Sequence, residues 1–329
     1  MDSNTLFHER YRLEKFLGSG TYSKVWLADD EITGGTQVAL KIFATENGLD
    51  DYGLNMFAHE FSLVSNINDP YILRPQHYDV CNRRPYLVLP YCKDGSVKSK
   101  TGHLKEKEAW DIIADVSRGL SVLHSMTPPI IHQDIKPDNI MVSDSGHYMI
   151  TDFGVSTHLN STLRRSVGAN YSYGGTKAYM APERFSRHKT SVMASDIYSL
   201  GATLYDLLSG EPPFGEEGGL LQKSGAEIPE LEGNFSSELK ELLEKCLALN
   251  SWERPTTEDL IAKAKEMKDK SKGSFSRKTE FFNGSDNEKL GEDEDSDKPY
   301  DGNHHISPIY YVSLSIIGIA IGVVLGFIL

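Results

Sequence analysis

Cysteine is scarce in this chain, and it does not occur in the spacings that bind zinc. The 329 residues include three cysteines, Cys81, Cys92 and Cys246, which are odd in number and far apart. This pattern argues against a disulfide framework or a structural zinc site, and it favours a reducing compartment. Basic residues are fewer than acidic residues. The net charge of −13 argues against a general nucleic-acid-binding surface.

Long apolar runs are also rare. The first ten residues, an expected N-terminal extension, contain no apolar run and therefore no secretory signal. One long run exists at 309–329, which carries no charge, and a helix of that length spans a hydrocarbon core of roughly 30 Å. We therefore expect a single membrane-spanning helix over 306–329, a tail anchor that leaves the rest of the chain in the cytoplasm. The alternative is a buried core helix, but the polar stretch before it provides no core.

Glycine recurs every fourth residue in this run, at Gly318, Gly322 and Gly326. Small residues on one helix face let two helices approach closely, which favours a homodimer. The alternative is that glycine is simply common in membrane helices.

The composition changes ahead of that run. Residues 269–305 are rich in polar side chains, and 280–301 hold nine acidic residues against two lysines. Such a stretch cannot offset its ordering entropy, so we expect a disordered acidic linker. Residues 11–268 instead alternate strand-like and helix-like patterns, with strands first. This order predicts an α+β fold with a small β-rich lobe at 11–90 and a larger helical lobe at 91–268.

A series of short motifs lies within 11–268. They read L-G-S-G-T-Y-S-K-V at 17–25, V-A-L-K at 38–41, L-V-L-P-Y-C at 87–92, I-H-Q-D-I-K-P-D-N-I at 131–140, T-D-F-G at 151–154 and G-T-K-A-Y-M-A-P-E at 175–183. Phosphoryl transfer from ATP needs a cradle for the phosphates, a cation to pair with them, metal ligands, and a carboxylate facing the attacking hydroxyl. These motifs contain residues of each of those kinds.

With these motifs, residues 11–268 resemble the eukaryotic-type serine/threonine protein kinase family, which implies a bilobal protein-kinase-like fold. The resemblance implies that ATP binds between the lobes, against the glycine loop and the hinge at 87–92. It also implies that Lys41 pairs with the α- and β-phosphates and with Glu60. The expected nucleotide-binding residues are Leu17, Gly18, Ser19, Gly20, Val25, Ala39, Lys41, Leu89, Pro90 and Cys92.

The same resemblance implies the catalytic parts. Asp134 orients the hydroxyl of the protein substrate, and Lys136 neutralises charge on the transferred phosphate. Thr176 bridges toward both of these residues. Asn139 and Asp152 are the expected ligands of Mg²⁺, with Mn²⁺ as a substitute.

The resemblance also reaches the scaffold of the larger lobe. It implies a buried ion pair between Glu183 and Arg254, and it places Asp196 on the central helix. Two positions depart from the family pattern. Ser23 stands where the glycine loop usually has its third glycine, and Gln133 stands where the family usually has the arginine of H-R-D. That arginine normally bonds a phosphorylated residue, so its absence weakens the case for activation by phosphorylation.

Three functions compete. The first is a membrane-tethered kinase acting on serine and threonine hydroxyls of proteins. The second is a catalytically weak pseudokinase serving as a membrane scaffold, which Gln133 and Ser23 favour. The third is a small-molecule phosphotransferase, which the peptide-docking element at 175–183 disfavours. Because no chemical part is missing from the motifs, the sequence favours the first.

Overall fold

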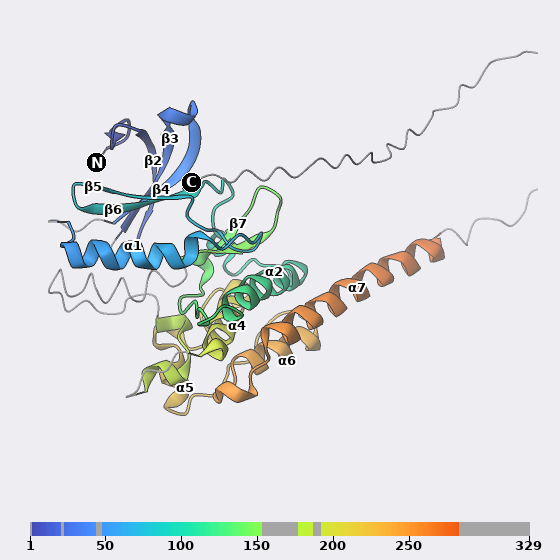
Figure 1. The fold of residues 1–329 in the computed structure, drawn as a ribbon. Helices are drawn as coiled ribbons and strands as arrows, with labels where there is room; N and C mark the ends of the chain where they lie inside the picture. The colour runs from blue at the N-terminus through green and yellow to red at the C-terminus, as the bar shows by residue number, and fades with distance from the viewer. Residues whose placement is uncertain (1, 21–22, 44–47, 153–176, 187–191, 283–329) are drawn as a thin grey trace, which may run out of the picture. The chain divides into compact units, whose positions relative to one another are not determined.

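The structure is a computed structural model that describes residues 2–20, 23–43, 48–152, 177–186 and 192–282. The chain divides into two units, Met1–Thr279 and Glu280–Leu329, and nearly all described residues belong to the first. Figure 1 shows this first unit, with strands in its N-terminal part and helices in its C-terminal part.

The N-terminal part is one antiparallel sheet in the order β1-β2-β3-β4-β6-β5. Its strands are β1 (Leu6–Phe7), β2 (Tyr11–Ser19), β3 (Ser23–Asp30), β4 (Thr36–Phe43), β5 (His77–Cys81) and β6 (Arg84–Pro90). Side chains alternate between the two faces of a strand. One face of β4 buries Leu40 and Ile42 in a cluster within the sheet lobe, while Ala39 packs against the main core.

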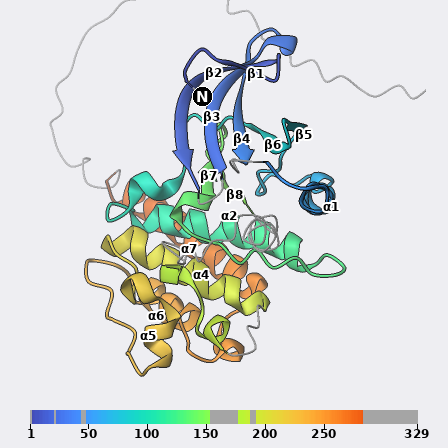
Figure 2. The same ribbon diagram turned by 90° about the vertical axis from the view of Figure 1, so that its left-hand side faces the viewer.

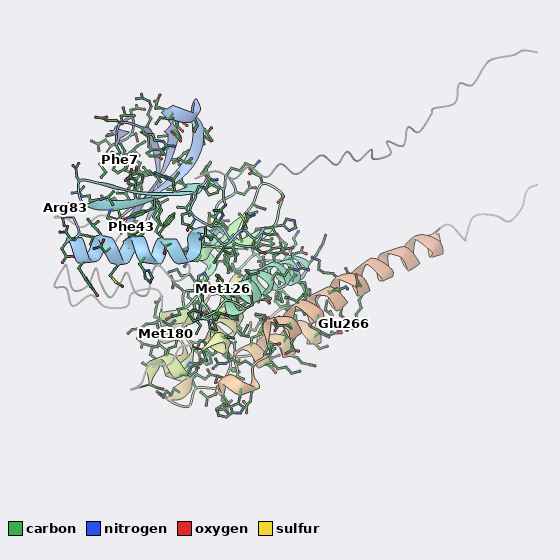
Figure 3. The ribbon with its side chains drawn as sticks, in the orientation of Figure 1. Phe7, Phe43, Arg83, Met126, Met180 and Glu266 are labelled. Carbon is green, nitrogen blue, oxygen red and sulfur yellow. The ribbon has the colours of Figure 1, made fainter. Side chains whose placement is uncertain are left out.

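Helix α1 (Asp51–Ser65) covers the sheet below β4 and β6 (Figures 1 and 3). The contact is aromatic: the rings of Phe43 and Phe57 meet edge to face with centroids 4.6 Å apart. Such a pair contributes packing energy beyond the area it buries.

The C-terminal part begins with α2 (Glu106–His124) and the short hairpin of β7 (Ile140–Val142) and β8 (Tyr148–Ile150). The helices described after this hairpin are α4 (Met193–Ser209), α5 (Gly219–Lys223), α6 (Ser237–Cys246) and α7 (Thr257–Phe282). Figure 2 shows these helices on the far side of the β7–β8 hairpin from the sheet. Every residue of α4 from Ser195 to Leu208 is buried, so this helix is the centre of the lobe.

The expected N-terminal extension is partly a strand. Leu6 and Phe7 form β1 and pair with Arg12 and Tyr11 of β2. A run of two strand residues is too short for a sequence pattern to detect. Phe7 is buried, and its ring meets that of Tyr86 edge to face at 5.1 Å.

The expected linker differs from the structure at its start. Helix α7 continues to Phe282, so residues 269–282 are helical rather than disordered. Charged pairs one turn apart support the extension: Lys270 bonds Glu266 at 2.6 Å, and Lys263 bonds the same carboxylate at 3.1 Å. Composition did not predict the helix over 269–282, because these residues have few apolar side chains to bury.

No helix among the described residues is long and apolar enough to span a membrane. The expected span at 306–329, with Gly318, Gly322 and Gly326, lies outside the residues that the structure describes, as does 283–305.

The expected ion pair of the larger lobe is confirmed. Arg254 donates Nη1 and Nη2 to the two carboxylate oxygens of Glu183, at 2.8 and 2.9 Å. Burial alone raises the pKa of Glu183, but hydrogen bonds from Arg254 and Ser195 outweigh it and hold that pKa below its usual value. The arginine side chain is fully buried, so loss of its partner leaves an uncompensated charge.

We predict that Phe7→Ala lowers the free energy of unfolding by about 3 kcal/mol, because it empties a buried aromatic site. For a domain of this size the melting temperature falls by about 6–12 °C. Leu6→Ala is the matched control, since Leu6 is 44% exposed and its truncation changes stability by about 0.5 kcal/mol or less. Equal melting temperatures for the Phe7 variant and the wild type contradict the packing of β1.

We predict that Glu183→Gln costs about 3 kcal/mol of stability at pH 7 in urea titrations. Because the folded-state pKa of Glu183 is lowered, the contribution is present above the unfolded-state pKa of about 4.3. The gap between variant and wild type therefore persists from pH 7 to 5 and narrows as the pH falls further. Glu266→Gln removes a surface pair with Lys263 and Lys270 and costs less than about 1 kcal/mol. Similar losses of stability in both variants contradict the stabilising role of the buried pair between Glu183 and Arg254.

Candidate active site

The sheet aligns several expected nucleotide-binding residues. Val25 of β3 is directly opposite Lys41 of β4, and Ala39 is opposite Leu89 of β6. Residues opposite each other in an antiparallel pair share a face, and so do residues two apart on a strand. Val25, Ala39, Lys41 and Leu89 therefore project from the same face of the sheet.

The expected glycine loop, 17–25, begins at the end of β2 and ends within β3. Leu17, Gly18 and Ser19 end β2, and Gly20 follows, with its N–H bonded to the carbonyl of Ser23 at 2.9 Å. A Cβ added at Gly18 meets no atom within 4 Å, so the backbone here is open to a ligand.

The expected hinge, 87–92, begins in β6 and continues past its end. Pro90 ends that strand and Cys92 is buried just beyond it. Burial raises the pKa of the Cys92 thiol to about 11, so this cysteine stays protonated at neutral pH.

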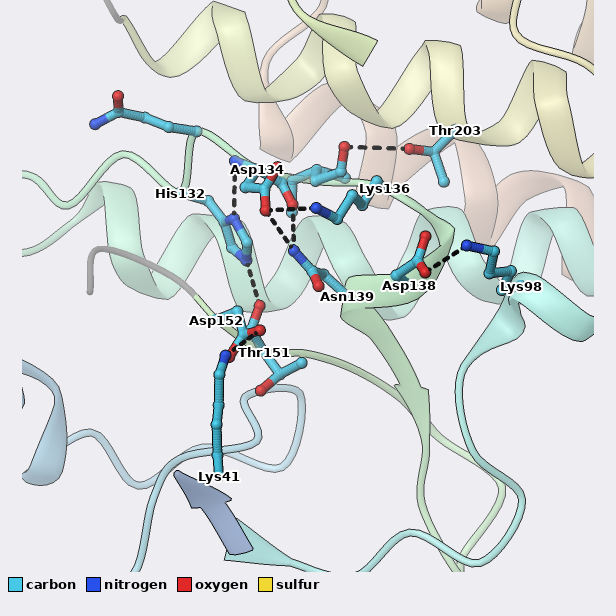
Figure 4. A network of polar contacts seen from close by, with 12 residues as sticks. Lys41, Lys98, His132, Asp134, Lys136, Asp138, Asn139, Thr151, Asp152 and Thr203 are labelled. Carbon is cyan, nitrogen blue, oxygen red and sulfur yellow. Dashed lines mark hydrogen bonds and ion pairs between the residues drawn. The ribbon is translucent and has the colours of Figure 1, made fainter. Parts of the chain in front are cut away.

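Asp134 is the centre of a polar network (Figure 4). Its Oδ2 accepts hydrogen bonds from Lys136 Nζ and Asn139 Nδ2, each at 2.9 Å, and its main-chain carbonyl accepts a second one from Asn139. Its Oδ1 is shielded from water and has no partner among the described residues. One carboxylate oxygen is thus fixed, and the other is an available acceptor.

His132 connects Asp134 to the segment around Asp152. Its Nδ1 accepts the N–H of Asp134 at 3.3 Å, which leaves Nε2 to donate to the carbonyl of Thr151 at 3.0 Å. Burial lowers the pKa of His132, consistent with a neutral ring that uses one nitrogen as an acceptor. This histidine links the main chain at Asp134 to the main chain at Thr151.

Lys41 reaches from the sheet to Asp152. The Nζ–Oδ2 distance is 2.6 Å. Burial alone raises the pKa of Asp152, but the charge and hydrogen bond of Lys41 outweigh it and hold that pKa below its usual value. Asp152 is therefore ionised at neutral pH. Its φ of +66° is unusual for a residue with a side chain and marks a held conformation.

The oxygens near Asp134 fit a magnesium ion. Asp152 offers a carboxylate, and Asn139 directs its NH₂ group to Asp134, which leaves its amide oxygen as an acceptor. No group of three or more His, Cys, Asp or Glu side chains suited to a metal occurs in the described part of the chain. Magnesium is usually held by one or two carboxylates together with substrate phosphates and water, so two protein ligands suffice.

The end of the 175–183 motif is held against α5. Gly219 donates its N–H to the carbonyl of Met180 at 2.9 Å, and a Cβ there lies 2.5 Å from the nitrogen of Pro182. Only glycine permits α5 to approach so closely. Figure 3 labels Met180 among the helices of the C-terminal part.

Five expected site residues meet in the network: Lys41, Asp134, Lys136, Asn139 and Asp152. Thr176 lies outside the described residues. Glu60 belongs to α1, but its side chain is not among those described. The ion pair described for Lys41 is with Asp152.

Sequence reasoning missed two residues. His132 stands in the 131–140 motif, so its spacing from Asp134 was a usable signal. Arg184, which donates Nη1 to the main-chain carbonyl of Gln133 at 2.6 Å, had no local signal because the two residues are far apart in sequence.

Comparison with known proteins agrees with this geometry. Residues 11–264 match the family model described as protein kinase domain. The serine/threonine-protein kinase PknA of Mycobacterium tuberculosis is 31% identical over 252 residues, which are 73% of this chain and 57% of that protein. A probable serine/threonine-protein kinase PknB of Bifidobacterium longum is 34% identical over 222 residues, 62% of this chain and 31% of that protein.

A third relative, named serine/threonine-protein kinases drp72, of Corynebacterium efficiens, is 30% identical over 244 residues, 71% of this chain and 46% of its own length. The matched regions thus span roughly a third to a little over half of these relatives. The family match itself covers most of the chain. This chain belongs to the protein kinase family, and its kinase domain is of the serine/threonine type.

Proposed function

We propose that this protein transfers the γ-phosphate of ATP to serine or threonine hydroxyls of protein substrates. The observation that carries the proposal is the state of Asp134: one carboxylate oxygen is fixed by Lys136 and Asn139, and the other is a buried acceptor that no described residue bonds. A buried carboxylate oxygen without a hydrogen bond is costly, and an incoming hydroxyl satisfies it.

In this proposal Asp134 accepts the hydrogen bond of the substrate hydroxyl through Oδ1 and aims its oxygen at the phosphate. Little covalent chemistry is required of the protein in phosphoryl transfer, so positioning and charge stabilisation dominate. Lys136, 2.9 Å from Asp134, supplies positive charge where the transferred group carries negative charge.

Lys41 and Asp152 neutralise each other in the structure. We assign Lys41 to the α- and β-phosphates, and Asp152 with Asn139 to Mg²⁺ or Mn²⁺. Bound ATP supplies the phosphoryl group and the leaving group, and the metal neutralises its charge. The nucleotide is assigned to the sheet face that carries Val25, Ala39 and Leu89.

We predict that Asp134→Asn in the full chain lowers kcat by at least about 100-fold, since it removes the carboxylate that orients the hydroxyl. Transfer of labelled phosphate from Mg-ATP to a basic test protein measures this. The affinity for ATP, read from the ATP-induced rise in melting temperature, stays unchanged.

Asp144→Asn is the matched control, because the side chain of Asp144 is exposed and its one ion pair among the described residues, with Lys93 at 3.7 Å, is also exposed. Equal labelling by wild type and the Asp134 variant refutes the catalytic assignment. A wild type that binds ATP without transferring phosphate favours the scaffold function.

We also propose that the segment 306–329 crosses a membrane and that the kinase domain faces the cytoplasm, where ATP and Mg²⁺ are available. The support is the uncharged run of 309–329, which is long enough for a bilayer. Gly318, Gly322 and Gly326 form a small-residue face on which two such helices pack as a homodimer.

We predict that deletion of 306–329 moves the protein from the membrane pellet to the supernatant after cell lysis and ultracentrifugation. Deletion of 283–305 is the matched control, since it removes a similar length of polar chain and leaves the protein in the pellet. A truncated protein that still resists extraction with salt and carbonate counts against the span.

A further inference from the structure

The peptide unit between Gln133 and Asp134 is held at both ends. Its carbonyl oxygen accepts a hydrogen bond from Arg184 Nη1 at 2.6 Å, and its N–H donates to His132 Nδ1 at 3.3 Å. The plane of this peptide unit fixes the Cα of Asp134, from which its side chain starts. Lys136 and Asn139 hold the carboxylate itself, so a shift of the plane displaces the carboxylate relative to these partners.

The backbone at Gln133 needs such support. Its φ of +68° lies in the left-handed region, which residues with a side chain rarely occupy. The N–H of Gln133 is bonded to Asp196 Oδ1 at 2.8 Å. Residue 133 is thus fastened through its N–H to α4 and through its carbonyl to Arg184. Surrounding bonds of this kind are what maintain an unfavourable conformation at a functional site.

The turn that contains Arg184 is held in place by bonds to the rest of the helical lobe. Arg184 lies in the 3-10 turn Pro182–Phe185, next to Glu183 in the same turn. Glu183 forms the buried ion pair with Arg254 and accepts a hydrogen bond from Ser195 at 2.6 Å. The N–H of Arg184 is bonded to the carbonyl of Ala181 at 3.1 Å. The guanidinium therefore starts from a turn that is anchored to the centre of the helical lobe.

We propose that Arg184 is a positioning residue for phosphoryl transfer: it holds the carbonyl of Gln133 and thereby directs the Asp134 carboxylate toward the substrate hydroxyl. The contact joins the turn Pro182–Phe185, at the end of the 175–183 motif, to the loop 131–140 that carries Asp134, here called the catalytic loop. It uses a main-chain acceptor, so it works with glutamine at position 133. The proposal rests on the proposed kinase function, because its kinetic effect is exerted through Asp134.

The test compares Arg184→Met and Arg184→Lys in the full chain. We expect Arg184→Met to lower kcat about 10- to 100-fold, as a small misplacement of a reacting group does, with the KM for ATP within about twofold of the wild type, since the nucleotide face of the sheet is untouched. Lysine can donate one hydrogen bond to the same carbonyl, so Arg184→Lys recovers kcat to within about fivefold of the wild type.

Arg12→Met is the matched control, because Arg12 makes an exposed pair with Glu31 on the sheet and its loss leaves kcat unchanged. Hydrogen–deuterium exchange gives a readout that does not depend on catalysis. In Arg184→Met, the amide of Asp134 exchanges at least about fivefold faster, whereas the strand amides of β3 and β4 do not change.

An unchanged kcat together with unchanged exchange at Asp134 overturns the role of Arg184. A loss of kcat that is equal in the methionine and lysine variants and accompanied by a matching fall in melting temperature shows a merely structural role and overturns it as well. A wild-type protein without phosphotransfer overturns the proposed function instead, and faster exchange in Arg184→Met then still supports the contact.

Discussion

The buried carboxylate of Asp196 is the interaction on which the catalytic loop depends. It is fully shielded from water, and it accepts hydrogen bonds from the main-chain N–H groups of His132 and Gln133, each at 2.8 Å, and makes a 2.9 Å contact with His124 Nε2. A buried carboxylate is tolerated only when donors surround it. Because α4 is the centre of the helical lobe, this group sets the position of the loop relative to the core.

A chain of polar contacts then leads from that loop to the sheet. His132 bonds the carbonyl of Thr151, and the next residue, Asp152, pairs with Lys41 of β4. The Lys41–Asp152 pair therefore links the sheet to the residues that follow β8, and its members are the proposed phosphate and metal ligands. Under the proposed function, Lys41 would pair with the nucleotide phosphates and Asp152 with the metal, so each would have a partner of opposite charge in place of the other.

Much of the site could be predicted because its residues lie close together in sequence. Asp134, Lys136 and Asn139 fall within six positions, and a local loop brings them into contact whatever the distant packing is. Contacts between residues distant in sequence were harder to predict. Arg184 bonds a main-chain carbonyl, and a pattern of side-chain types does not indicate such a bond. The helical part of 269–282 was missed because polar composition resembles that of a linker, and pairs such as Glu266 with Lys270 decide the conformation.

Strand β1 has a consequence for how the domain is completed during synthesis. His8 and Tyr86, whose side chains are 2.8 Å apart, are separated by 78 residues, and Phe7 packs on the same tyrosine. During synthesis β1 leaves the ribosome long before Tyr86, on which Phe7 packs. Until β6 emerges, this aromatic edge stays open to water and to chaperones, so the earliest part of the lobe is among the last to be enclosed.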